Sequence, residues 1–224
     1  MSGDAKAKII GVSIETSGTG IYLTDNAYIS ELSANVKSFH TANGTCAYDA
    51  VCLNGNARID LISGGEYSNY YTDEYIQWWY ENRSLSEISS YTVNLISDGA
   101  SIGEISGGEF LGVMDKANNG AVIHVNAGSV EKISGGYFGF CKSGLSNPYY
   151  LLYVNTANGA SIGEITGGTY EAGSSTKGFN CDFAGIVDNS GCKTTTLEET
   201  VTVYIQFSTK VTEYTLKVIT VEAK

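Results

Sequence analysis

The sequence has little proline, little positive charge and no long apolar run. Only one of its 224 residues is proline, and 13 lysines and arginines stand against 24 acidic residues, giving a net charge of −11. This charge repels phosphates and anionic lipids, so neither nucleic acid nor a membrane surface is an expected partner. Because no stretch of about 18 apolar residues and no basic-then-apolar start is present, we expect neither a transmembrane span nor a signal peptide.

The sequence also lacks the short motifs that usually accompany catalysis. It contains no H-E-x-x-H, no G-x-S-x-G, no phosphate-binding loop and no nonapeptide calcium repeat. We therefore predict no catalytic residue, no metal ligand and no cofactor; enzymatic activity stays an open question, with a non-catalytic role favoured. His124 lies within an apolar segment, where we expect a core residue rather than a general base.

Cysteine is present but follows no metal-binding or redox spacing. The five cysteines include no C-x-x-C pair, and their odd number leaves at least one thiol unpaired. Bridges between Cys46 and Cys52 and between Cys181 and Cys192 are conceivable. Buried free thiols are the favoured interpretation, because free cysteine behaves as a small hydrophobic residue.

Glycine and tyrosine are abundant, with 27 and 16 copies. Together with many serines, threonines and asparagines, they are typical of short strands joined by tight turns, and they argue against a helical bundle.

One pattern, an isoleucine, a serine or threonine, two glycines, any residue and an aromatic, occurs four times. Its copies are Ile62–Tyr67, Ile105–Phe110, Ile133–Phe138 and Ile165–Tyr170. A diverged copy without the glycines covers Asn26–Ser33. Equivalent positions in the five copies are 30, 43, 28 and 32 residues apart, and this spacing indicates a repeat architecture.

Each repeat holds short apolar segments separated by polar or glycine corners, so successive repeats can stack as coils joined by parallel hydrogen bonds. Two inward residues three positions apart cannot lie on one flat strand, so we expect a corner near Gly103 and Glu104. Lys132 would then stack between Glu104 and Glu164. The expected interior columns are Ile59, Ile102, Val130 and Ile162; Ile62, Ile105, Ile133 and Ile165; and the aromatic Tyr67, Phe110, Phe138 and Tyr170.

The pattern I-x-x-I-[ST]-G-G-x-[FY] resembles that of the pectin-lyase-like fold and, more narrowly, of glycine-rich modules in large bacterial surface proteins. The resemblance covers residues 20–191. It implies an all-β fold, a right-handed parallel β-helix (solenoid) of about five to six coils with inserted loops. Ala184–Gly191 is expected to be the strand of a truncated sixth coil. A leucine-rich-repeat horseshoe is the rival, and it is disfavoured because the repeats lack L-x-x-L-x-L and a helical segment.

The last segment differs in kind from the repeats. Val201–Phe207 and Tyr214–Val221 alternate apolar and polar residues, which predicts a C-terminal β-hairpin. We therefore divide the chain into a β-helix at 1–195, with an N-terminal cap strand and an aromatic insertion at 68–92, and a hairpin cap or linker at 196–224.

The longest repeat step, 43 residues, contains both tryptophans of the chain. We expect this insertion to project from the solenoid and to bind, because inserted loops and exposed Trp and Tyr side chains are frequent contact sites. Packing of these rings against the solenoid is the alternative. A second aromatic loop follows Phe138, and in-register stacking would bring both loops out on one side. The candidate binding residues are Tyr70, Tyr71, Tyr75, Trp78, Trp79, Tyr80, Phe140, Tyr149 and Tyr150.

Glu66 and Glu109 occupy the same repeat position, so adjacent coils would place these carboxylates side by side. Paired carboxylates serve glycosidases, but solvated acids on the flank of a coil are the favoured interpretation.

These observations favour a non-catalytic binding module, an adhesin, of an extracellular or bacterial cell-surface protein. We expect a monomeric module within a larger multidomain chain. The Tyr, Ser, Gly and Asn content suits adaptable protein contacts, so a host protein such as a mucosal glycoprotein or an immunoglobulin is the expected partner. The alternatives are a carbohydrate-binding or polysaccharide-degrading β-helix, in which Trp78 or Trp79 stacks on a sugar, and a structural spacer.

Overall fold

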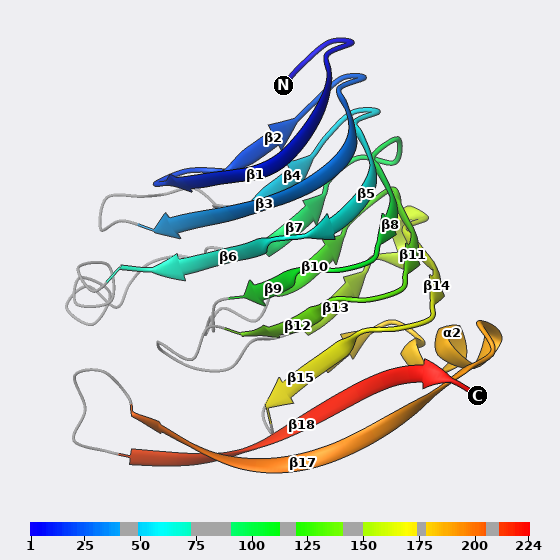
Figure 1. Ribbon diagram of the computed structural model, residues 1–224. Coiled ribbons are helices and arrows are strands. Elements are labelled where there is room, and N and C mark those ends of the chain that lie inside the picture. The colour runs from blue at the N-terminus through cyan, green and yellow to red at the C-terminus, as the bar shows by residue number, and fades with distance from the viewer. Residues whose placement is uncertain (41–48, 73–90, 113–119, 141–149, 174–177, 205–210) are drawn as a thin grey trace.

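The chain folds into two sheets that wrap around one apolar core (Figure 1). The computed structural model describes residues 1–40, 49–72, 91–112, 120–140, 150–173, 178–204 and 211–224. The architecture is all-β and solenoid-like, as predicted, with strands that are mostly parallel.

The first sheet has six parallel strands, one from each successive coil. Its order is β16-β13-β10-β7-β4-β2, so neighbouring strands are separated in sequence by a whole repeat. The strands are β2 (Ile21–Leu23), β4 (Val51–Leu53), β7 (Tyr91–Leu95), β10 (Ala121–Val125), β13 (Tyr150–Val154) and β16 (Gly178–Asn180).

The second sheet covers two faces of the solenoid, because one long strand joins them. The first half of β3 (Tyr28–His40) pairs with β5 (Arg58–Gly64), and its second half pairs with β6 (Glu66–Tyr71). β1 (Lys6–Thr16) lies parallel to β3 at the N-terminal end. The remaining strands of the stack are β8 (Ser101–Ile105), β9 (Glu109–Gly112), β11 (Ser129–Ile133), β12 (Tyr137–Phe140), β14 (Ser161–Ile165) and β15 (Thr169–Gly173).

The three predicted interior columns are confirmed. Their residues are paired in register from coil to coil, and each is at most 6% exposed. The aromatic rings stack almost parallel, with centroid distances of 4.9 Å from Tyr67 to Phe110, 5.1 Å from Phe110 to Phe138 and 4.8 Å from Phe138 to Tyr170. Stacked apolar columns therefore form the core.

The expected corner is a bend inside each strand rather than a break between strands. β8 runs through Gly103 and Glu104, and both Ile102 and Ile105 point into the core. Lys132 pairs with Glu104 and Glu164 on the adjacent strands, as predicted. Its Nζ lies 4.0 Å from Glu164 Oε2 in an exposed pair, which contributes little stability.

The paired glycines of the repeat meet two structural requirements, and Gly65 meets both of them. The second glycine has a left-handed backbone, with φ of +96° at Gly65, which favours a residue without a Cβ atom. The first glycine lies close to the preceding coil, since a Cβ atom on Gly107 would stand 2.6 Å from the Ser63 carbonyl oxygen. Both positions therefore restrict the side chain.

The C-terminal end of the stack corrects one prediction. The sixth coil consists of β16, and Ala184–Gly191 is not a strand but belongs mostly to helix α2 (Phe183–Asn189). The Asp182 side chain accepts a hydrogen bond from the Gly185 N–H and caps the helix. Phe183 and Val187, four residues apart, are buried against the end of the core. None of the described helices is long and apolar enough to span a membrane.

The predicted C-terminal hairpin is confirmed and is longer than expected. β17 (Cys192–Tyr204) and β18 (Val211–Ala223) pair antiparallel, and β18 also pairs antiparallel with β15. The hairpin therefore ends the parallel stack, and residue 195 falls inside β17.

Three of the cysteines lie within the described residues, and all three are free thiols. Cys52 and Cys192 are buried and Cys181 is partly buried, so no bridge joins Cys181 to Cys192. Cys46 and Cys141 lie outside the described residues.

Candidate binding surface

Most of the candidate binding residues lie outside the described residues, in segments 73–90 and 141–149. Tyr71 and Phe140 end strands β6 and β12. Tyr70 and Tyr150 are described with their side chains. The candidates outside the described residues are Tyr75, Trp78, Trp79, Tyr80 and Tyr149.

The places where these loops leave the solenoid are well defined. β6, β9, β12 and β15 pair in register, so their C-terminal ends lie along one edge of the sheet (Figure 1). The segments that follow Tyr71, Gly112, Phe140 and Gly173 therefore depart from the same edge.

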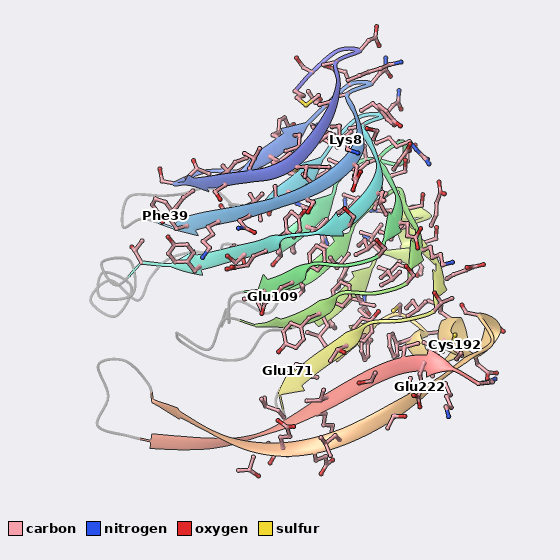
Figure 2. The ribbon with its side chains drawn as sticks, viewed as in Figure 1. Lys8, Phe39, Glu109, Glu171, Cys192 and Glu222 are labelled. Atoms are coloured by element: carbon pink, nitrogen blue, oxygen red, sulfur yellow. The ribbon has the colours of Figure 1, made fainter. Side chains whose placement is uncertain are left out.

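Tyr70 has a structural environment within the second sheet. Its hydroxyl donates a hydrogen bond to Glu15 Oε1 at 2.8 Å, and its ring lies 5.6 Å from that of Phe39 on β3 (Figure 2 labels Phe39). Burial, with the neighbouring Glu15, raises the pKa of Tyr70 to about 12. Tyr70 therefore connects β6 to β1 and β3, and it lies in a different sheet from Tyr150.

Tyr150 belongs to an aromatic cluster on the first sheet, which we call the Tyr–His cluster (Tyr91, His124, Tyr150 and Tyr153). The His124 ring on β10 stacks on Tyr91 of β7, with a centroid distance of 3.9 Å and an interplanar angle of 5°. On the other side His124 lies 5.1 Å from Tyr153 of β13, and Tyr153 lies 5.1 Å from Tyr150. Four half-buried rings from three adjacent strands thus form one continuous surface.

His124 is therefore not a core residue, and this prediction was wrong. It alternates with the fully buried Ile123 and Val125, so its side chain lies on the opposite side of the strand. Burial among the neighbouring rings lowers its pKa to about 4, and the ring is neutral at pH 7. Nδ1 lies 2.8 Å from Asn94 Oδ1, an acceptor, which assigns the proton to Nδ1.

A buried carboxylate extends this polar network. Asn94 Nδ2 donates a hydrogen bond to Asp49 Oδ2 at 2.9 Å, and Asp49 is only 4% exposed. Asp49 Oδ1 has no hydrogen-bond partner among the described residues. Desolvation raises the pKa of Asp49 to about 6, although Asn94, the Tyr91 backbone and Cys52 oppose the shift.

Cys52 is unsuited to act as a nucleophile in this network. Burial and the adjacent Asp49 carboxylate raise the pKa of its thiol well above the ordinary range, so the thiolate is not populated at neutral pH. Because the pKa of His124 is near 4, its ring is also a weak general base at neutral pH. The network therefore favours structure and contact over catalysis.

We expect replacement of Asp49 by asparagine to stabilise the fold at pH 7 by about 1–2 kcal/mol, because the ionised carboxylate is disfavoured by burial. The raised pKa of Asp49, about 6 against an ordinary 3.8, means that the native protein regains this stability as the pH falls from 7 to 4. The lowered pKa of His124, about 4 against 6.5, acts in the opposite direction over the same interval.

Urea denaturation of the native protein and the Asp49→Asn variant between pH 4 and 7 measures this difference. The advantage of the variant should shrink toward zero near pH 4. The other titrating groups are common to both proteins and cancel in the difference. An advantage that does not change with pH would contradict the assignment to Asp49.

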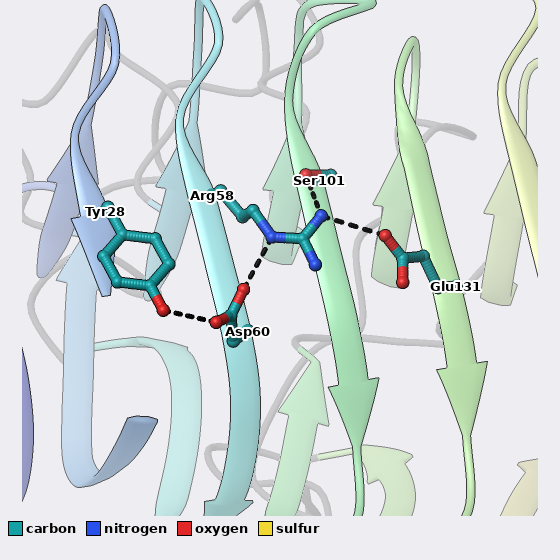
Figure 3. A network of polar contacts seen from close by, with 5 residues as sticks. All are labelled: Tyr28, Arg58, Asp60, Ser101 and Glu131. Carbon is teal, nitrogen blue, oxygen red and sulfur yellow. Dashed lines mark hydrogen bonds and ion pairs between the residues drawn. The ribbon is translucent and has the colours of Figure 1, made fainter. Parts of the chain in front are cut away.

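A second polar network lies on the second sheet (Figure 3), and three of its residues, Arg58, Asp60 and Glu131, line a groove of about 800 Å³. Arg58 Nε donates a hydrogen bond to Asp60 Oδ1 at 2.6 Å. Arg58 Nη1 donates to Glu131 Oε1 at 2.9 Å and to Ser101 Oγ at 3.5 Å. Tyr28 donates a hydrogen bond to the other oxygen of Asp60. These contacts connect four adjacent strands, and we assign them a structural role.

The two carboxylates singled out by the repeat are adjacent. Glu66 on β6 pairs in register with Glu109 on β9 (Figure 2 labels Glu109). Glu66 forms an ion pair with Lys37, in which Glu66 Oε1 lies 3.1 Å from Lys37 Nζ. No cluster of three or more potential metal ligands occurs among the described residues.

No protein-family model matches the chain, and comparisons with curated proteins and with solved structures give no match. The functional assignment therefore depends on the geometry and chemistry of the chain itself.

The sequence does carry a signal for the Tyr–His cluster. Cys52, Asn94, His124 and Tyr153 occupy one position on successive strands of the first sheet. Each stands between two apolar residues, so strict alternation places all four on the side away from the core.

Proposed function

We propose that the chain is a non-catalytic binding module on a right-handed parallel β-helix, and that aromatic side chains at one edge of the solenoid engage a partner protein. The observation that carries this proposal is the Tyr–His cluster. It places four rings on one surface, and the described groups around it form no arrangement suited to catalysis. Parallel strands joined by a crossover are almost always connected with a right hand, which supports the handedness.

The cluster directly adjoins the segments that hold the other candidate residues. Tyr91 opens β7 immediately after residues 73–90, which include Trp78 and Trp79. Tyr150 opens β13 immediately after residues 141–149. Both aromatic segments of the sequence are thus followed directly by a residue of the cluster, and we include their aromatic residues in the proposed contact surface.

A protein partner fits this surface better than a sugar. Tyr91 and His124 stack face to face, so those ring faces are not available to a sugar ring. Tyrosine hydroxyls and ring edges instead suit the mixed polar and apolar contacts of a protein interface. We propose a host protein, such as a mucosal glycoprotein or an immunoglobulin, and an extracellular or bacterial cell-surface setting, in keeping with the resemblance to glycine-rich surface modules.

The test is binding of the chain to immobilised mucin and immunoglobulin by surface plasmon resonance. Tyr153→Ala is expected to weaken binding by about 30-fold, the effect of losing one hot-spot ring. The double variant Trp78→Ala, Trp79→Ala loses two rings and should weaken binding by at least as much. Tyr22→Ala is the matched control, because Tyr22 lies on the same sheet at its N-terminal end and is 44% exposed. It should bind like the native protein.

Thermal unfolding of each variant separates the alternatives. A tryptophan variant that unfolds would show that these rings pack against the solenoid. Binding to a glycan array, without binding to either protein, would favour the carbohydrate-binding alternative. Loss of binding in the Tyr22 variant as well as the Tyr153 variant would contradict the proposed surface.

A further inference from the structure

The edges of the described sheets are short, irregular or covered, with one exception. β2 and β16, at the two edges of the first sheet, have three residues each. Helix α2 packs against β14, and Ser190 Oγ accepts a hydrogen bond from the Ile165 N–H there. β1 is irregular, because its register with β3 shifts between Ile10 and Val12 and φ is +67° at Gly11. Natural proteins use such features to prevent strands of other molecules from adding to an edge.

β17 is the exception. It has 13 residues, β18 is its only partner among the described strands, and its register with β18 is unbroken (Figure 1). Residues 193–200 are exposed on both faces of the strand, and Leu197 is 58% exposed. The segment is rich in threonine, which favours extended strands. β17 thus has the properties of an edge that accepts another strand.

We propose that β17 pairs antiparallel with β17 of a second copy of this chain, across a two-fold axis at Thr196. Directly opposite residues of an antiparallel pair have their side chains on the same face of the sheet. Because side chains alternate along a strand, residues that face each other in a symmetric pair are an even number of positions apart. The two-fold axis therefore passes beside a residue and not between two residues. With the centre at Thr196, Lys193 stands opposite Glu199 of the second copy, twice by symmetry. Leu197 lies diagonal to Leu197 of the second copy, at a separation that allows side-chain contact.

The charges select this register over its neighbours. Centring the pair on Glu198 would place two carboxylates directly opposite each other, which is destabilising. Centring it on Leu197 would place Lys193 opposite Val201 and Glu199 opposite Thr195, so both charges would lose their partners. Only the register at Thr196 matches Lys193 with Glu199.

The net charge of −11 does not oppose this contact locally. Two ion pairs lie along the hairpin, one between Lys217 and Glu198 and one between Lys193 and Glu222 at its end (Figure 2 labels Glu222). Lys224 adds a further positive charge at the same end and pairs with Asp188. The proposal departs from the monomeric module expected from the sequence, and it is independent of the Tyr–His cluster.

Charge reversal tests both the contact and its register by sedimentation velocity over a wide concentration range. The native chain is expected to form dimers as its concentration rises. Lys193→Glu places two pairs of glutamates opposite each other, and Glu199→Lys places two pairs of lysines opposite each other. Each variant alone should therefore dimerise at least about tenfold more weakly than the native chain. An equimolar mixture of the two variants has both pairs complementary and should recover dimers.

Thr156→Lys and Thr156→Glu change charge at an exposed turn outside the hairpin and should dimerise like the native chain. Circular dichroism melting establishes that every variant is folded. A native chain that stays monomeric at all concentrations overturns the proposal and leaves this edge to a strand of another protein. Single variants that dimerise normally, or a mixture no better than its components, would also overturn it.

Discussion

Replacing Phe110 by alanine is expected to lower the free energy of unfolding by about 3–5 kcal/mol, the usual cost of deleting a large buried ring. Phe110 is fully buried between Tyr67 and Phe138, with ring centroids 4.9 and 5.1 Å away. The neighbouring coils are fixed by their own hydrogen bonds, so they cannot collapse into the cavity. Guanidinium denaturation monitored by circular dichroism measures the loss.

The matched control is Phe110→Leu, which keeps most of the apolar volume but loses both ring contacts. We expect it to cost clearly less than the alanine variant, because the cavity is smaller. If alanine and leucine destabilise the protein equally, ring stacking rather than filled volume holds the column together. A loss below about 1 kcal/mol for alanine would contradict a rigid column.

The second large effect is expected at the glycine pair. Gly65→Ala should cost more than about 3 kcal/mol, because an alanine there has an unfavourable left-handed backbone and also a steric clash. A Cβ atom on Gly65 would stand 2.1 Å from the Ala34 carbonyl oxygen, and φ is +96°. The clash is with backbone, so no side-chain rotation relieves it. Denaturation of the purified variant gives the cost.

Gly159→Ala separates the two contributions. Gly159 also has a left-handed backbone, with φ of +75°, but a Cβ atom there would meet nothing within 4 Å. We expect this control to cost only about 1 kcal/mol, the backbone part alone. Equal losses at the two glycines would show that coil-to-coil spacing adjusts easily, contrary to the close contact at Gly65.

The sequence predicts the stacking of the coils well, because equivalent residues of the repeat have the same surroundings in every coil. Ile62 and Tyr67 meet the same environment as their equivalents in every coil, so one pattern, read four times, identifies three columns. The two ends of the coil stack cannot be predicted from the repeat pattern, because each end occurs only once in the chain. Ala184–Gly191 resembles an earlier strand, yet Asp182 caps a helix there and the spacing of Phe183 and Val187 suits a helix that covers the core.

The candidate surface was predicted only in part, for a different physical reason. Aromatic residues in an insertion are easily recognised in a sequence as candidate binding residues. Tyr91, His124 and Tyr153 are not, because they lie within apolar strands that follow the repeat. Their partnership depends on register between coils, and a stack such as that of Tyr91 on His124 becomes visible only when the strands are placed side by side. Tyr70 shows the reverse case, since it adjoins the insertion but contacts Glu15 and Phe39 of the scaffold.

The direction of the inter-coil hydrogen bonds has a mechanical consequence. These bonds run along the axis of the stack, and the N- and C-termini lie at its opposite ends (Figure 1). A tensile load between the termini therefore acts on one strand pair after another, in the manner of a zipper, instead of shearing many bonds at once. Each coil that peels away releases about 30 residues, or roughly 100 Å of extended chain. Under load such a molecule lengthens in small successive steps and dissipates work over a long distance.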